Sequence, residues 1–166
     1  MRIYGLQQDS IVDGPGFRFA CFVQGCPHGW PGCHNPDSHD STGGREMTVE
    51  EVAEQLLGNP LTDGLTLSGG EPFAQPEDCL RLARIAHGHG LNVWSYSGWT
   101  FEYLRDQGTA AQRALLEELD VLVDGPFLLD QRTLALPWRG SRNQRVIDVP
   151  ASLRAGEAVQ RPDESM

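Results

Sequence analysis

The sequence of 166 residues contains no lysine, so all thirteen of its basic side chains are arginines. Schiff-base chemistry and the phosphate-binding lysine of a P-loop both require a lysine ammonium group, so both are excluded. Twenty-three acidic residues outnumber the basic ones and give a formal net charge of -10. Because nucleic-acid binding relies on clustered positive charge, we do not expect nucleic acid as a partner.

Long apolar runs are also missing. No apolar stretch approaches the length of about eighteen residues that a membrane-spanning helix needs, and the opening MRIYGLQQDS lacks the apolar core of a signal peptide. We therefore expect no membrane partner and a cytoplasmic protein. In that compartment, metal binding or redox chemistry explains cysteines better than disulfides do. The chain has four of them: Cys21, Cys26, Cys33 and Cys79.

Strand-like apolar segments alternate with helical patterns along the chain. The predicted strands are 17–24, 64–67, 91–97 and 120–125, and the predicted helices are 48–58, 76–90, 100–108 and 109–119. Two of these helices begin with a possible capping box, in which a threonine is followed three residues later by Glu or Gln. Such alternation predicts βαβ units, and hence an α/β fold with a mostly parallel sheet.

The length of the chain predicts one domain, because a full eight-stranded α/β barrel needs more residues. We assign this domain to residues 1–150. The remaining residues, 151–166, show little periodicity and are predicted to form a C-terminal tail.

Four segments rich in Gly, Cys, Ser and Asp follow the predicted strands: GCPHGWPGCHNP, SGGEP, SYSGW and VDGPF. In parallel α/β sheets, ligands bind at the carboxyl ends of the strands, so these segments are expected to meet at one site. Cys26 and Cys33 lie seven residues apart on a loop rich in Pro and Gly, which favours metal ligation over simple burial. Cys21, in a strand, and Cys79, on the apolar side of a helix, are expected to pack in the core.

The segment SGGEP has two interpretations. Gly69 and Gly70 allow a ligand to approach the backbone closely, and the Glu71 carboxylate is able to bind an ammonium group; the alternative is an ordinary Gly-Gly turn. Asp13 and Asp124 each precede a glycine, so each is either a site residue or a turn residue. Four residues near the C-terminal end of the predicted domain form either a partner-docking surface or a solvated face: Trp138, Arg139, Arg142 and Asn143.

The cysteine loop followed by SGGEP resembles the radical S-adenosylmethionine (SAM) superfamily, whose cysteine motif is C-x3-C-x2-C. Within that superfamily, IVDGPG, PGCHNP, VLVDGPF and WRGSRNQR are similar to segments of the activating proteins of anaerobic ribonucleoside-triphosphate reductases. This resemblance implies a partial (β/α) barrel that binds a 4Fe-4S cluster and SAM. It also implies reductive cleavage of SAM with an electron from a flavodoxin-like donor, to place a glycyl radical on the reductase.

Residue by residue, the resemblance assigns Cys26 and Cys33 as cluster ligands, while Trp30 stands where the second cysteine is expected. The residues implied near SAM are Gly32, Cys33, His34, Ser68, Gly69, Gly70 and Glu71. An indole nitrogen only donates hydrogen bonds, so it does not replace a thiolate. Three explanations remain open: a third ligand from His28 or His34, a third ligand from Cys21, or impaired cluster chemistry.

Two alternative functions also remain open at this point. One is a degenerate homologue that binds the reductase or SAM without catalysis. The other is a small-molecule radical SAM enzyme, such as a 7-carboxy-7-deazaguanine synthase, although VDGPF and WRGSRNQR favour the activating protein.

Overall fold

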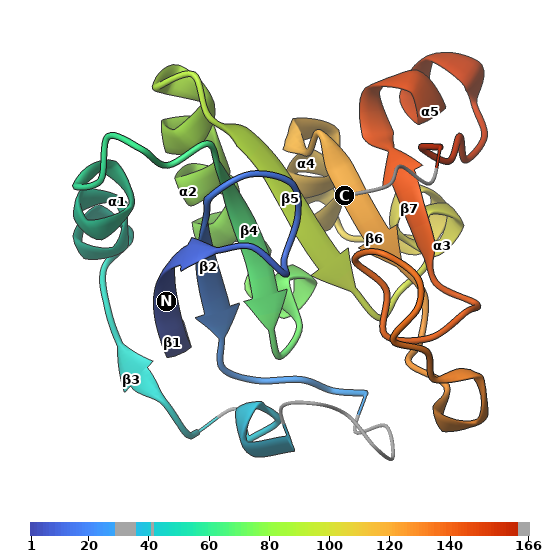
Figure 1. Ribbon diagram of the computed structural model, residues 1–166, viewed down its shortest axis with the longest axis horizontal. Helices are drawn as coiled ribbons and strands as arrows, with labels where there is room; N and C mark the ends of the chain where they lie inside the picture. The colour runs from blue at the N-terminus through green and yellow to red at the C-terminus, as the bar shows by residue number, and fades with distance from the viewer. Residues whose placement is uncertain (29–35, 41, 163–166) are drawn as a thin grey trace.

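The computed structural model describes residues 1–28, 36–40 and 42–162. Within that part of the chain, one sheet of seven strands runs in the order β3-β1-β2-β4-β5-β6-β7 (Figure 1). The central strands β2, β4, β5 and β6 are parallel. At one edge β1 pairs antiparallel with β2 and with β3, and at the other edge β7 pairs antiparallel with β6. The predicted α/β fold, a partial barrel with a mostly parallel sheet, is confirmed, and the sheet is open. The strands are β1 (Arg2–Ser10), β2 (Arg18–Val23), β3 (Arg45–Glu46), β4 (Gly64–Gly69), β5 (Asn92–Ser97), β6 (Val121–Asp124) and β7 (Arg145–Asp148).

The helices begin where the sequence places their caps. In α1, Thr48 and Glu51 form the expected capping box, and Thr109 and Gln112 form the one that starts α4, so two backbone donors at each start are satisfied. The helices are α1 (Val49–Leu57), α2 (Pro76–Gly88), α3 (Phe101–Gln107), α4 (Ala110–Glu118) and α5 (Val149–Ala155), with short 3-10 turns η1 (Pro36–Ser38), η2 (Pro72–Ala74) and η3 (Leu129–Gln131). No helix in these described ranges has the length and apolar character that crossing a membrane requires.

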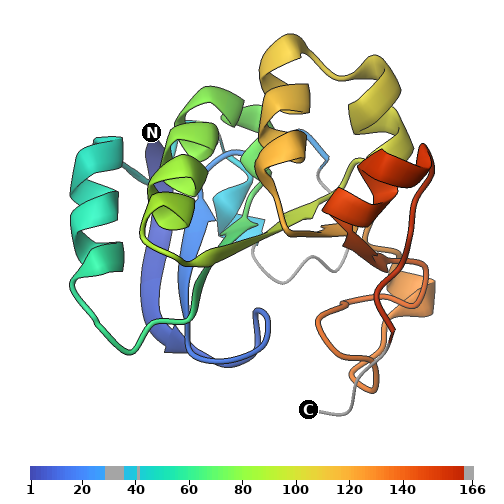
Figure 2. The same ribbon diagram turned by 90° about the horizontal axis from the view of Figure 1, so that it is seen from above.

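The two faces of the sheet are covered differently. Figure 2 shows α1, α2, α3 and α4 on one face and the loops 11–17 and 125–144 on the other. Successive side chains on a strand point to opposite faces, so Val93 joins the helix-side core while Trp94 joins a small cluster under the loops. Cys21 and Cys79 both lie fully buried in the helix-side core, which confirms that they pack.

Sequence patterns did not predict β1, β3, β7 or α5. β1 has the sequence RIYGLQQDS, which ends in four consecutive polar residues, so it lacks a strand's apolar alternation. α5 is only seven residues long, too short for a periodic pattern, and is defined instead by its ends. The Asp148 carboxylate accepts a hydrogen bond from the Ala151 amide at 3.0 Å, and Gly156 ends the helix at φ 74°. The segment predicted as a C-terminal tail therefore begins within a helix.

Candidate functional site

A cleft of about 820 Å3 opens at the carboxyl ends of the parallel strands. It is lined by Phe22 from β2, by Tyr96 and Ser97 from β5, and by loops on either side. Four of the residues predicted for the site line it as well: Cys26, Ser68, Gly69 and Gly70. The strand-end segments that are separated along the chain therefore meet at one place, as the parallel topology requires.

The base of the cysteine loop is closed by hydrogen bonds between its two ends. The Gln24 side-chain amide donates to the carbonyls of Asp37 at 2.9 Å and Asp40 at 2.7 Å. The Gly25 amide donates to the Ser38 carbonyl at 2.6 Å, and the Cys26 amide to His39 at 3.1 Å. The chain that leaves at Cys26 thus returns beside it. The predicted site residues Gly32, Cys33 and His34, and also Trp30, lie outside the described residues.

The two glycines of SGGEP are required by the chain itself. Gly69 has φ 92°, and a Cβ there would lie 2.7 Å from Phe22 Cα. A Cβ on Gly70 would collide with the carbonyl oxygen of Gly25. The backbones are joined at this point, because the Gly70 amide donates to Val23 O at 2.8 Å and the Glu71 amide to Gly25 O at 2.8 Å. Both glycines also face the cleft, so one stretch of bare backbone serves the loop contact and the cavity wall.

Glu71 follows Gly70, which lines the cleft, and is itself only 1% exposed. Its Oε1 accepts hydrogen bonds from His28 Nε2 at 2.7 Å, from Gly98 N at 2.7 Å and from Ser97 Oγ at 3.1 Å. Its Oε2 accepts one from Phe73 N at 3.1 Å. The carboxylate therefore binds donors of its own chain in this structure, and the ammonium-binding role expected from the sequence stays a prediction.

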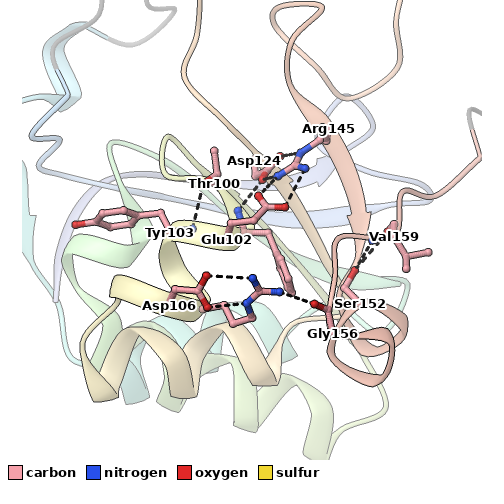
Figure 3. Close-up of polar contacts among 11 residues, drawn as sticks. Thr100, Glu102, Tyr103, Asp106, Asp124, Arg145, Ser152, Gly156 and Val159 are labelled. Carbon is pink, nitrogen blue, oxygen red and sulfur yellow. Dashed lines mark hydrogen bonds and ion pairs between the residues drawn. The ribbon is translucent and has the colours of Figure 1, made fainter.

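The two aspartates left open by the sequence have different roles. Asp13 lines the cleft, where its carboxylate accepts a hydrogen bond from Ser10 Oγ at 2.5 Å. Asp124 is 1% exposed, and its oxygens accept from Arg145 at 2.5 and 3.0 Å and from Phe101 N at 2.7 Å (Figure 3). Its hydrogen bonds and those of Glu102 raise the pKa of Arg145. Asp124 thus joins β6, β7 and α3, and Asp13 faces the cavity.

Comparison with known proteins identifies the family. A 4Fe-4S single cluster domain matches residues 12–147. The chain is 36% identical over 156 residues to the anaerobic ribonucleoside-triphosphate reductase-activating protein of Salmonella typhimurium, covering 88% of this chain and 97% of that one. The protein of that name from Escherichia coli is also 36% identical, over 82% of this chain and 92% of the relative. This chain belongs to the family of anaerobic ribonucleoside-triphosphate reductase-activating proteins.

A more distant match is also consistent with this family. The pyruvate formate-lyase-activating enzyme of Clostridium pasteurianum is 38% identical over 97 residues, which is 55% of this chain and 41% of that enzyme. The resemblance read from the cysteine loop, SGGEP and the later segments is therefore confirmed.

The thiols of this family member only partly match the cluster that the family implies. Cys26 lines the cleft, and Cys33 follows on the same loop in the sequence. Cys21 does not complete the set, because it points into the helix-side core, where burial raises the pKa of its thiol to about 12. The described residues contain no group of three His, Cys, Asp or Glu side chains placed to hold a metal ion. Cys26 and Cys33 supply two of the three thiolates that the family's cluster uses, and a third ligand from His28 or His34 stays a prediction, so we derive no reaction step through the cluster.

Sequence reasoning did not locate the outer wall of the cleft. The loop 133–140 supplies it, including Trp138, whose ring packs against the Trp94 ring with centroids 5.7 Å apart. Arg139 lines the same wall, while the Asn143 amide donates to Pro126 O at 2.7 Å and shapes the loop. Tyr96 was also missed, and burial raises the pKa of its phenol. The sequence signal for this wall was the segment PWRG, and its role as a wall follows only from its position across the cleft.

Proposed function

We propose that this protein activates an anaerobic ribonucleoside-triphosphate reductase by generating a glycyl radical through reductive cleavage of SAM. The observation that carries the proposal is the cleft, in which Cys26 and the two-glycine loop share one cavity at the strand ends. Its volume of about 820 Å3 lies in the range of small-molecule sites, which is about 300–1,000 Å3. The relatives are activating proteins of anaerobic ribonucleoside-triphosphate reductases, which indicates the reductase as the partner.

In this proposal, Ser68, Gly69 and Gly70 contribute exposed backbone and a hydroxyl to the SAM site. Gly32, Cys33 and His34 are assigned to the same site by the family pattern, and Cys26 with Cys33 to the metal. Glu71 is also assigned to this site by the family pattern, and its hydrogen bonds join the surrounding loops.

The proposed setting is the cytoplasm, with a flavodoxin-like protein as the electron donor and no role for nucleic acid. The thiols of Cys21 and Cys79 support a reducing compartment, because both are free within the described structure. The net charge of -10 argues against a nucleic-acid partner.

The proposal is tested by anaerobic reconstitution with iron and sulfide, followed by dithionite and SAM. We compare the wild type with Trp30→Cys and with Cys26→Ala, and measure iron per chain and 5′-deoxyadenosine formed. Trp30→Cys restores a third soft ligand, so it is expected to bind about four irons and to cleave SAM. Adding the reductase then yields a glycyl-radical signal by electron paramagnetic resonance. The wild type is expected to cleave SAM as well, although less than Trp30→Cys does. No turnover by either form refutes the proposal, and turnover by Trp30→Cys alone supports the second candidate below.

A non-catalytic homologue is the second candidate, and Trp30 favours it together with the buried, protonated Cys21. Such a protein binds the reductase or SAM, yet forms no 5′-deoxyadenosine. Wild-type turnover that is abolished in Cys26→Ala excludes it and shows that another residue completes the cluster.

A further inference from the structure

Glu71 is a buried carboxylate in an environment made almost entirely of hydrogen-bond donors. Burying a charge is costly unless it is hydrogen-bonded, and here four donors within 3.1 Å satisfy the two oxygens. The donors come from three separate segments: the cysteine loop, the 3-10 turn η2 and the end of β5. A single side chain therefore connects three of the strand-end segments that form the cleft.

His28 closes this network on the side of the cysteine loop. It lies two residues after Cys26, and its side chain is 11% exposed. Its ring meets Trp99 edge-on with centroids 4.8 Å apart. The Trp99 amide donates to Ser97 Oγ at 3.1 Å, and that hydroxyl in turn donates to Glu71. The contacts form a closed circuit through His28, Glu71, Ser97 and Trp99, so the cysteine loop and the β5 end are held at a set separation.

The hydrogen bonds at Glu71 require two acceptor oxygens, which a carboxylate provides. An ionised carboxylate only accepts hydrogen bonds, whereas an amide of the same shape offers one acceptor oxygen and one donor nitrogen. In a Glu71→Gln variant, that nitrogen faces either the Phe73 amide or the three donors at Oε1. Either orientation places donor against donor, so at least one contact of the network is lost.

We propose that Glu71 is a positioning residue, which acts through His28 and Gly98 to hold the cysteine loop and the β5 end against the two-glycine loop. This deepens the proposed function and rests on it only for the identity of what the cleft binds. The glutamate of SGGEP thus has partners within its own chain, while the backbone of Gly69 and Gly70 lines the cleft.

The test uses amide hydrogen exchange of the full, ligand-free chain at one fixed pH, measured over segments 24–28 and 97–99. Glu71→Gln and His28→Leu are each expected to speed exchange in 24–28 by about tenfold, the equivalent of one buried hydrogen bond to a charged group. His28→Gln keeps an N–H near the place of Nε2 and is expected to restore most of the protection. The double variant Glu71→Gln/His28→Leu is expected to add little to either single change, because both break the same contact.

The matched control is Asp124→Asn, another carboxylate that is 1% exposed and held by the chain's own donors. It is expected to lower global stability while leaving exchange in 24–28 unchanged. Equal acceleration by Asp124→Asn, or no acceleration by Glu71→Gln, overturns the positioning role. If Glu71→Gln does not fold, the positioning role is tested by comparing His28→Leu with His28→Gln. Equal exchange rates in these two variants also overturn that role.

Binding of S-adenosylhomocysteine, measured by calorimetry, separates this inference from the proposed function. The wild type is expected to bind, and Glu71→Gln to bind at least about tenfold more weakly. A wild type that does not bind, with the exchange results as expected, refutes the adenosyl site and leaves the positioning role standing. Equal affinity of the wild type and Glu71→Gln refutes the positioning role alone.

Discussion

Asp124 and Glu102 allow a direct comparison of a buried and an exposed acceptor of the same arginine. Arg145 Nη2 donates to Asp124 at 2.5 Å and to Glu102 at 2.6 Å (Figure 3). The Asp124 side chain is 1% exposed, whereas the Glu102 side chain is 44% exposed. Asp124 also accepts the Phe101 amide at the start of α3, so it has a second structural partner.

We expect Asp124→Asn to lower the free energy of unfolding by about 3 kcal/mol. A broken buried ion pair costs about 3–5 kcal/mol, and the lower end applies because Arg145 keeps Glu102 as a partner. Glu102→Gln is expected to cost about 0.5–1 kcal/mol, the usual value for an exposed pair. Urea unfolding of both variants at pH 7 gives the two values. Equal costs, or a cost below about 1 kcal/mol for Asp124→Asn, contradict the structural role that we assign to Asp124.

Two further predictions concern the fold. Gly69→Ala is expected to lower the free energy of unfolding by about 2 kcal/mol or more, because its Cβ meets the Phe22 backbone. Gly90→Ala, whose Cβ would have nothing within 4 Å, is expected to cost only the backbone strain of about 1 kcal/mol. Thermal melts compare the two variants, and equal shifts in melting temperature refute the steric argument. Burial lowers the pKa of His87, but hydrogen bonds to Asp120 and Glu118 outweigh it and raise the pKa above its ordinary value. This stabilisation is fully present below about pH 6.5 and is lost as the pH rises through the raised value. His87→Gln is therefore expected to cost more stability in urea at pH 6 than at pH 8.5, and a cost that is the same at both pH values argues against the interaction.

The repeating strands and helices could be predicted from the sequence because their signals are local. The capping boxes at Thr48 and Thr109 join residues only three positions apart, and the apolar runs of β2 and β6 are continuous. The order of the cysteine loop, SGGEP and the later segments also predicted the family and the edge of the sheet where the site lies. These features do not depend on how distant parts of the chain meet.

The edge elements and the far wall of the cleft could not be predicted in this way. β1 carries polar residues along much of its length, so its place in the sheet depends on pairing with β2 and β3. The loop 133–140 has no regular hydrophobic pattern in its sequence. It forms a wall of the cleft only because it folds over the face of the sheet opposite α1 to α4 (Figure 2).

The roles of the acidic site candidates were decided by tertiary structure alone. In the sequence, Glu71 and Asp124 are equivalent, as carboxylates beside glycines at the ends of strands. The hydrogen bond from His28 to Glu71 spans 43 positions, and the one from Arg145 to Asp124 spans 21. A carboxylate binds whichever donors surround it, and burial makes those donors obligatory. The sequence placed Glu71 and Asp124 at the ends of strands. Because their donors come from distant segments, only the tertiary structure determined that these two side chains join those segments.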